Sequence, residues 1–231
     1  MTRLIGSLAA TVVLVLPLAG VASRGGEGEG WVELFNGTDL SGWKAFLPGG
    51  EDPAKTWSVA DGILTCSGTP AGYLQTTQDY TSFELELDWR FDAAKGAGNS
   101  GVLMRINGAD KVWPNSIEAQ LHSLNAGDIW NIGDFPMVTD KARTEGRRTK
   151  KATGTNEKPL GEWNHYKIVL DGGSLKMFVN GALQNEASAC AATPGRIGLQ
   201  SEGSYIQFRH IRLKNLDKGS PTTAPAVPAK K

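Results

Sequence analysis

Apolar and polar residues alternate along the segment FELELDWRF, which covers residues 83–91. Phe83 and Leu85 fall on one side of an extended chain, and Glu84 and Glu86 fall on the other. This period of two is typical of a half-buried strand in an antiparallel sheet, whereas a helix repeats about every 3.6 residues. We therefore predict a strand here, with one face packed in a core.

The same alternation recurs in short segments along the rest of the chain. These segments are GVLMRI (101–106), SIEAQLH (116–122), HYKIVL (165–170), LKMFVNG (175–181), GRIGLQ (195–200) and IQFRHIRL (206–213). Turn sequences separate them: Asp171-Gly172-Gly173 ends one strand, and Asn180-Gly181 is typical of a tight hairpin. The chain also contains 29 glycines in 231 residues, which favours many turns. Together these features predict an all-β fold, either an antiparallel β-sandwich or a barrel.

The first 22 residues have the pattern of a signal peptide. Arg3 supplies a positive start, residues 4–18 are almost wholly apolar, and Ala22 precedes a plausible cleavage site. The apolar run is too short to span a bilayer comfortably, and no later segment resembles a stop-transfer sequence. We therefore expect an exported protein, secreted or periplasmic, with no membrane span.

The remaining chain divides by composition into three parts. We predict a flexible leader at residues 23–30, one globular domain at residues 31–216, and a disordered Pro- and Ala-rich tail at residues 217–231. Lys and Arg number 24, and Asp and Glu also number 24, so the formal net charge is zero. A neutral chain has no general attraction to nucleic acid, so we expect no nucleic-acid partner.

The chain has two cysteines, Cys66 and Cys190. An even number of cysteines in an exported protein favours a disulfide over free thiols. Neither cysteine has a second Cys or a His at the spacing of a zinc site. We therefore predict a disulfide between them.

One predicted strand carries a row of side chains suited to acid–base chemistry. Within SIEAQLH, the residues Ser116, Glu118, Gln120 and His122 share a face. The row faces either a ligand cleft or plain solvent, and alternation alone does not decide between them. The sequence has no Gly-x-Ser-x-Gly elbow, no phosphate loop and no His-Glu-x-x-His motif.

Two tryptophans flank this strand. Trp113 and Trp130 fall in predicted loops on either side of it, where an aromatic ring could stack on the apolar face of a sugar. Each ring could equally plug a loop against the sandwich. A carbohydrate ligand on this face is thus one of two interpretations.

A cluster of basic residues lies in a segment without strand signals. It consists of Lys141, Arg143, Arg147, Arg148, Lys150 and Lys151, and we call it the basic cluster. Long strandless segments in a compact domain are usually functional or disordered. The basic cluster therefore either reaches over a binding face or forms a solvated loop.

Ordered motifs extend from Trp31 to about Leu216. They are WVELFNGTDLSGWK (31–44), GNSGVLMRI (98–106), VWPNSIEAQL (112–121), GDIWNIG (127–133), GEWNHYKI (161–168), FVNGALQNEA (178–187) and GRIGLQSEGSYIQFRHIRL (195–213). As a set they resemble the 3-keto-disaccharide hydrolase family. The resemblance implies a concanavalin A-like lectin/glucanase jelly roll, and substrates that are glycosides already oxidised to a ketone at the third carbon.

The implied reaction differs from ordinary glycoside hydrolysis. The ketone acidifies the neighbouring C2–H, so a base can remove that proton, the group at C1 is eliminated, and water then adds back. Glucanase relatives with this fold carry a Glu-x-Asp-x-x-Glu row for the two-carboxylate mechanism. Here the row begins Glu118-Ala119-Gln120, and the partner carboxylates are missing. In the family GLQ is often followed by His-Gly, whereas here Ser201-Glu202-Gly203 follows it.

Residue chemistry and the predicted strand faces provide groups for this reaction. Glu118 is the predicted base, Arg105 or a divalent cation would stabilise the enolate oxygen, and His122 or His210 would protonate the leaving group. No cofactor is certain, and the metal is unknown. The residues predicted to bind substrate are Gln120, Asn99, Trp113, Trp130, Gln200, Glu202 and His210.

Two other functions remain open at this point. A non-catalytic carbohydrate-binding module would use the same face without needing Glu118 as a base. A structural or interaction domain at the cell surface would instead use the basic cluster and the Pro-rich tail. The oligomeric state, the leaving group and the anomer of the substrate do not follow from the sequence.

Overall fold

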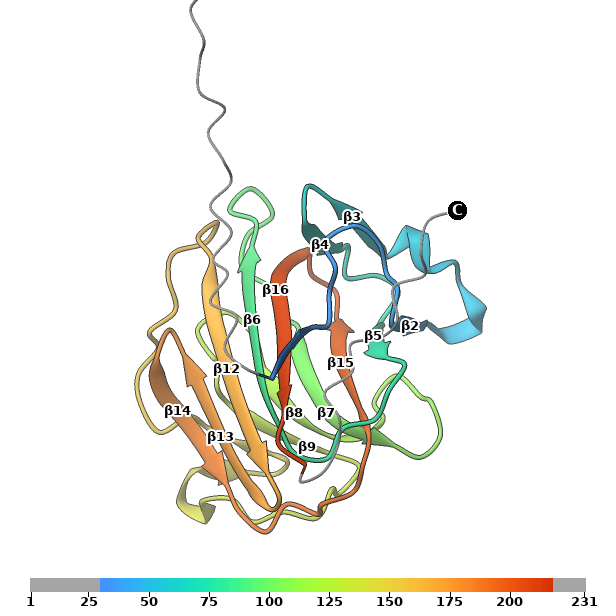
Figure 1. Ribbon diagram of the computed structural model, residues 1–231. Coiled ribbons are helices and arrows are strands. Elements are labelled where there is room, and N and C mark those ends of the chain that lie inside the picture. Colours follow the sequence, from blue (N-terminus) through green and yellow to red (C-terminus); the bar gives the residue numbers. More distant parts are fainter. Residues whose placement is uncertain (1–29, 218–231) are drawn as a thin grey trace, which may run out of the picture.

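The computed structural model describes residues 30–217, which form a sandwich of two antiparallel β-sheets (Figure 1). The first sheet has the order β14 (Ala182–Ala187), β13 (Ser174–Val179), β12 (Asn164–Asp171), β6 (Phe83–Phe91), β16 (Ile206–Asn215), β4 (Ile63–Cys66) and β3 (Trp57–Ala60), with β1 (Trp31–Glu33) also paired to β16. The second has the order β10 (Thr144–Glu145), β11 (Arg148–Thr149), β9 (Ile129–Ile132), β8 (Asn115–Gln120), β7 (Gly101–Asn107), β15 (Arg196–Ser201), β5 (Gly72–Thr76) and β2 (Trp43–Phe46). Three short 3-10 helices lie in loops: η1 (Pro48–Gly50), η2 (Pro53–Lys55) and η3 (Lys141–Arg143).

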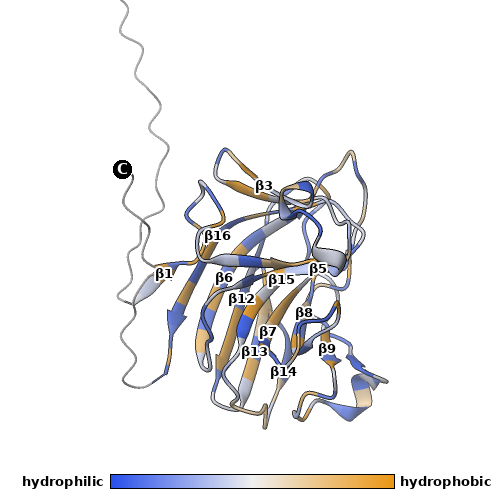
Figure 2. Ribbon diagram, turned by 90° about the vertical axis from the view of Figure 1, so that its right-hand side faces the viewer, coloured by the Kyte–Doolittle hydropathy of each residue, from blue (hydrophilic) through white to orange (hydrophobic). Residues whose placement is uncertain are grey.

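The core lies between the two sheets and is filled by alternate residues of each strand. In β6, Phe83, Leu85 and Leu87 are completely buried, whereas the residues between them are partly exposed. Trp89 continues this row and packs against Tyr166 of β12, with ring centres 5.4 Å apart. The hydropathy colouring of Figure 2 shows the same alternation along the strands. The predicted half-buried strand and the all-β sandwich are confirmed.

The predicted turns of the β12–β13–β14 meander are present. Asn180 and Gly181 both have positive φ, 48° and 83°, which is the geometry of the tight hairpin turn that Asn-Gly favours. Gly172 also has a positive φ, 52°, between the paired residues Asp171 and Ser174. The turn residues therefore set the register that buries alternate residues of these strands.

In the strand pairings of residues 30–217, the register shifts at four places, and two of these β-bulges carry predicted site residues. One lies in β7, between Met104 and Asn107, where Arg105 has a φ of 53°. The other lies in β16, between Arg209 and Arg212, where His210 has a φ of 51°. A bulge adds an unpaired residue and redirects its side chain, so strict alternation does not hold at either position.

The predicted disulfide is wrong, because Cys66 and Cys190 are both free, buried thiols. Cys66 pairs with Ile206, which also pairs with Phe91 at one end of β6. The backbone N–H of Cys190 instead bonds to Gly173, in the β12–β13 turn at the opposite end of β6. Nine residues of strand span roughly 27 Å, whereas a disulfide needs Cα atoms less than about 7 Å apart.

The proposed signal peptide, the leader up to residue 29 and the tail from residue 218 lie outside the described residues. Asp217 belongs to the folded part, because its carboxylate accepts hydrogen bonds from the backbone N–H groups of Thr81 and Ser82. The folded part therefore extends one residue past the predicted boundary at 216. In the stretch from 30 to 217, no helix is long and apolar enough to cross a membrane.

Candidate functional site

A pocket of about 340 Å³ opens on the side of the second sheet that faces away from the core. Residues of β8, β9 and the loops beside them form its walls. They are Asn99, Trp113, Glu118, Gln120, Trp130, Ile132, Arg147 and Glu202. Six of the eight are predicted site residues. Of the polar row on SIEAQLH, Glu118 and Gln120 face this pocket, whereas Ser116 and His122 do not line it.

Glu118 lies in the pocket with its side chain almost completely buried, 5% exposed. Its Oε1 atom has no regular hydrogen-bond partner among residues 30–217. Burial raises the pKa of this carboxyl group to about 8, and the nearby Glu202 adds to the rise, while Gln200 and Arg147 oppose it. A carboxyl group with such a pKa gains or loses its proton near the pH at which an enzyme works.

Gly101 of β7 makes room for this carboxyl group. A Cβ atom at this position would lie 2.6 Å from Glu118 Oε1 and 2.3 Å from Gln200 Oε1. Both distances are far below van der Waals contact. Because Gly101 has no side chain, the side chains of Glu118 and Gln200 can both lie close to the backbone of β7 at this position.

Several buried polar atoms around Glu118 have no partner among the described residues. Gln200 is completely buried, and neither its Nε2 nor its Oε1 makes a hydrogen bond of regular geometry, although its side chain lies close enough to Glu118 to lower the pKa of that carboxyl group. The Oδ1 atom of Asn99 is likewise unpaired, although the backbone of Asn99 is held by the Ser204 hydroxyl. Buried polar groups are normally satisfied, so this set suits a ligand that carries hydroxyl and carbonyl groups.

Glu202 and Gln120 complete the polar lining. Glu202 lies just after β15, and burial raises the pKa of its carboxyl group. The Oε1 of Gln120 accepts hydrogen bonds from the backbone N–H groups of Leu121 and His122, which fixes its side chain where β8 ends. The pocket thus holds two carboxyl groups whose neutral forms are favoured by burial.

The aromatic walls are the two predicted tryptophans. Trp113 is 42% exposed at the pocket, and Trp130 of β9 is partly buried, with its indole N–H unpaired in the described part of the chain. Ile132, which sequence reasoning did not select, is the apolar residue beside them. Sugar stacking on these rings stays a prediction.

Arg147 is the other lining residue that was not selected individually, although it belongs to the basic cluster. It sits in the turn between β10 and β11, and β11 pairs with β9 so that Arg148 faces Trp130. The guanidinium carbon of Arg147 lies 5.9 Å from the Trp130 ring centre. The basic cluster therefore reaches the pocket through this one residue.

Arg105, predicted to stabilise an enolate, does not lie in the pocket. The β7 bulge directs its side chain away, and the guanidinium is completely buried. It donates to the carbonyl oxygens of Thr81, Gly172 and Ala191 at 3.0, 2.7 and 2.6 Å. These bonds tie three loops together, so Arg105 has a structural position.

The two histidines predicted as acids also lie elsewhere. His122 follows the end of β8 and is exposed, with Nδ1 2.9 Å from the Ser123 carbonyl oxygen. His210 lies on the outer face of the first sheet, where its Nδ1 is 3.0 Å from an oxygen of Asp88. Neither imidazole lines the pocket, so neither is placed to protonate a leaving group there.

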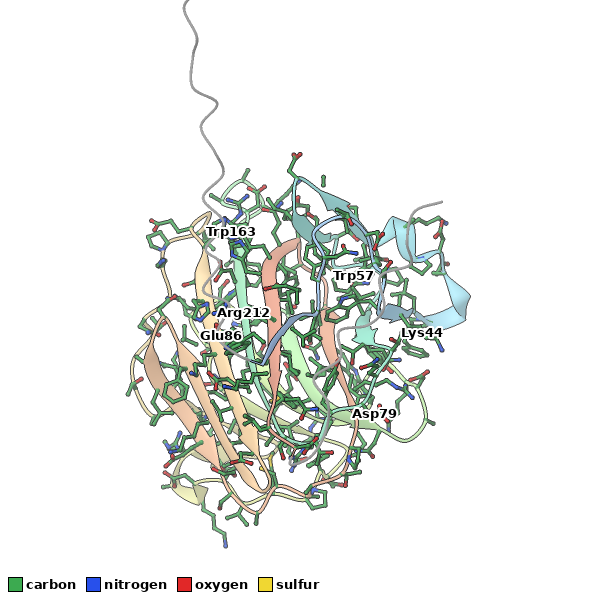
Figure 3. The ribbon with its side chains drawn as sticks, in the orientation of Figure 1. Lys44, Trp57, Asp79, Glu86, Trp163 and Arg212 are labelled. Atoms are coloured by element: carbon green, nitrogen blue, oxygen red, sulfur yellow. The ribbon has the colours of Figure 1, made fainter. Side chains whose placement is uncertain are left out.

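The outer face of the first sheet carries charges in matched pairs. Asp88 contacts His165, His210 and Arg209, and Glu86 contacts Arg212 at 2.6 Å. Figure 3 shows Glu86 and Arg212 together on this face, with Trp163 farther along it. The Trp163 ring lies beneath the guanidinium groups of Arg90 and Arg209, at 4.4 and 4.1 Å.

In residues 30–217, no cluster of three or more His, Cys, Asp or Glu side chains has an arrangement suited to hold a metal ion.

Comparison with known proteins agrees with the sequence resemblance. A 3-keto-disaccharide hydrolase from Bacteroides thetaiotaomicron is 26% identical over 241 residues, covering 83% of this chain and 80% of the relative. The crystal structure of a candidate glycosyl hydrolase from Parabacteroides distasonis superposes with a TM-score of 0.61 and 26% identity, over 82% of this chain and 95% of that one.

More distant structures share the fold alone. A β-glucanase from Bacillus licheniformis has a TM-score of 0.54 at 15% identity, over 80% of this chain and 96% of its own. This structural similarity confirms the predicted concanavalin A-like jelly roll. The family model of the 3-keto-alpha-glucoside-1,2-lyase-like domain matches residues 30–214. The chain therefore belongs to the family of 3-keto-alpha-glucoside-1,2-lyase-like domains.

Proposed function

We propose that this protein is an exported enzyme that cleaves 3-keto-glycosides by elimination followed by hydration. The observation that carries the proposal is the Glu118 carboxyl group, buried in a pocket with two tryptophans and a pKa of about 8. The family match and the name of the Bacteroides relative support a glycoside substrate. The signal-like sequence of residues 1–22 supports export to the periplasm or the medium.

Glu118 acts as the base in this proposal. Its carboxylate removes the proton from C2 of the 3-keto sugar, which is acidified by the neighbouring ketone. An ordinary exposed glutamate with a pKa near 4.5 is a weak base, and burial strengthens Glu118 by disfavouring its charged form. The base must be ionised to act, so kcat/KM is expected to rise with pH through about 8.

The group at C1 then leaves with its bonding electrons and needs a proton. Glu202 is the other carboxyl group that lines the pocket, and burial keeps its pKa above the usual range. The charge of Glu202 raises the pKa of Glu118, however, so Glu202 is already ionised when Glu118 acts as the base. We therefore assign Glu118 itself as the donor: it passes the proton taken from C2 to the leaving oxygen, in place of the two histidines. Water then adds across the C1–C2 double bond and gives the free 3-keto sugar.

The test replaces Glu118 and a matched glutamate outside the pocket. Glu118→Gln is expected to lower turnover of a 3-keto-glucoside at least about 10²-fold while the fold stays intact. Glu186→Gln is the control, because Glu186 is an exposed strand residue of the first sheet. Both variants are assayed with the 3-keto-glucoside and with its unoxidised parent, and their thermal unfolding is recorded.

The same assay separates an enzyme from a carbohydrate-binding module. The enzyme turns over the oxidised glycoside and leaves the parent intact. A binding module binds either sugar without turnover, and Glu118→Gln then changes nothing but affinity. Full activity in a normally folded Glu118→Gln variant would eliminate Glu118 as the base.

A further inference from the structure

Three of the six side chains of the basic cluster form ion pairs with acidic neighbours. Arg143 Nε donates to Asp140 at 2.9 Å, and Arg148 Nε donates to Asp128 at 2.6 Å. Arg147 differs, because its guanidinium has no hydrogen bond or ion pair in the described part of the chain. A cation without a fixed counter-charge keeps all its donors available to a ligand.

The backbone around Arg147 is nevertheless firmly placed. Its carbonyl oxygen accepts a hydrogen bond of 2.8 Å from the Asn131 N–H, which joins the β10–β11 turn to β9. Its guanidinium lies over the Trp130 ring and lines the pocket together with Glu118. Among the described residues that line the pocket, Arg147 is the only basic one.

The charge of Arg147 also reaches Glu118. It lowers the pKa of that carboxyl group and so opposes the effects of burial and Glu202. This electrostatic contact means that an anion formed next to Glu118 also falls within the field of Arg147. The neighbouring donors in this wall are amide groups, which stabilise a full negative charge less strongly.

We propose that Arg147 binds the C3 oxygen of the substrate and stabilises the negative charge that develops on it. This inference rests on the proposed function of the pocket. It gives the β10–β11 turn a specificity role, because a glycoside without a ketone forms no such charge. Arg147 thus has the role of stabilising the enolate oxygen, which the sequence analysis assigned to Arg105.

The first step forms an enolate and conserves protons and electrons. Glu118 takes the C2 proton, the C2–H electron pair forms a C2=C3 bond, and the ketone π pair moves to the C3 oxygen, where Arg147 donates to it. When this enolate collapses, C3=O re-forms, C1=C2 forms, and the C1–O bond breaks. The leaving oxygen keeps the bonding pair and takes the proton that Glu118 removed from C2.

The experiment measures the first step separately from bond cleavage. Methyl 3-keto-glucoside is incubated in D₂O, and NMR follows both the exchange of its C2 proton and the release of methanol. We expect Arg147→Met to slow both about 10²-fold, as loss of a donor to a developing oxyanion does. Arg147→Lys keeps the charge without the forked geometry and is expected to fall between Arg147→Met and the wild type.

The pH profile distinguishes an electrostatic role from a merely structural one. Removing the positive charge raises the pKa of Glu118, so the rising limb of kcat/KM should shift to higher pH in Arg147→Met and not in Arg147→Lys. Lys141→Met, which removes an exposed charge of the basic cluster outside the pocket, should leave both rate and profile unchanged.

The outcomes separate the two proposals. If the wild type neither exchanges the C2 proton nor releases methanol, the proposed function is wrong and the role of Arg147 is wrong with it. If the wild type does both and a folded Arg147→Met variant matches it in rate and profile, only the role of Arg147 is overturned. A slower variant with a shifted profile supports the role.

Discussion

Two carboxyl groups, one on each sheet, show how burial and pairing produce opposite chemistry in the same sandwich. Asp88, on the outer face of the first sheet, receives hydrogen bonds from His165 and His210, each at 3.0 Å, and from Arg209 at 3.1 Å. Burial alone would raise the pKa of Asp88, but these hydrogen bonds outweigh it and lower the pKa to about 2. This group stays ionised and is saturated with partners.

Glu118, on the second sheet, has the opposite surroundings. Burial and the charge of Glu202 raise its pKa to about 8, and Arg147 and Gln200 only partly offset them. Asp88 stabilises the fold because its partners are already in place, whereas Glu118 Oε1 has no regular hydrogen-bond partner among residues 30–217. The difference supports the proposal that the pocket beside Glu118 is the active site and that the charged outer face of the first sheet is structural.

The largest expected effect is on stability at high pH, and it would sharpen this contrast. A raised pKa means that Glu118 contributes its full stability below its unfolded pKa of about 4.5, and that the contribution is lost as the pH rises to about 8. At about 1.4 kcal/mol per pKa unit, the loss amounts to about 5 kcal/mol at pH 9. Glu118→Gln cannot ionise, so its free energy of unfolding should exceed that of the wild type at pH 9.

Urea unfolding of both proteins at pH 4 and pH 9 measures this difference. The gain in Glu118→Gln should be large at pH 9 and nearly absent at pH 4. Glu186→Gln, at an exposed position, should match the wild type at both values. Equal stability of the wild type and Glu118→Gln at pH 9 would show that the Glu118 carboxylate is well solvated, and the contrast with Asp88 would fail.

A second experiment closes the space beside Glu118. Gly101→Ala places a Cβ atom where Glu118 and Gln200 now lie, so at least one of the two side chains must move. Because Gly101 has an ordinary φ, the substitution costs no backbone strain and acts through space alone. We expect kcat/KM for a 3-keto-glucoside to fall about 10²-fold, as misplacement of a reacting group by about 1 Å can do.

Gly154→Ala is the matched control, because an added Cβ there meets no atom within 4 Å. Its activity and melting temperature should equal those of the wild type. If Gly101→Ala keeps full activity and folds normally, the floor of the pocket does not position Glu118 for catalysis.

The strands and the central residues of the pocket could be predicted because they follow period-two alternation without interruption. In SIEAQLH, Glu118 and Gln120 fall on one face, and the structure places both in the pocket. Trp113 and Trp130 were selected because they flank this row in the sequence, and both line the pocket. The many short alternating segments and the Asn180-Gly181 turn predicted an all-β sandwich or barrel, and the jelly roll was implied by the family resemblance.

The errors have one main physical cause, which is the β-bulge. Arg105 and His210 each lie in a bulge with positive φ, and alternation in the sequence does not show where a bulge will occur. His122 lies just beyond the end of β8, where alternation no longer applies. Arg147 lies in a two-residue turn, so no alternating pattern could assign it to a face of the sheet. Only its membership of the basic cluster indicated that it could reach a binding face.

The smallest expected effect tests the other side of the comparison, by removing the charge of Asp88. A lowered pKa means that Asp88 contributes stability above its unfolded pKa of about 3.8, and that the contribution is lost as the pH falls through about 2. Asp88→Asn should therefore lower the free energy of unfolding at pH 7 by about 1–2 kcal/mol, allowing for the partly exposed partners. The deficit should narrow as the pH falls from 4 towards 2, and urea unfolding across that range measures it. Turnover of the 3-keto-glucoside should stay at the wild-type level, because Asp88 lies on the face opposite the pocket. A loss of turnover without a loss of stability would mean that the charged face takes part in function after all.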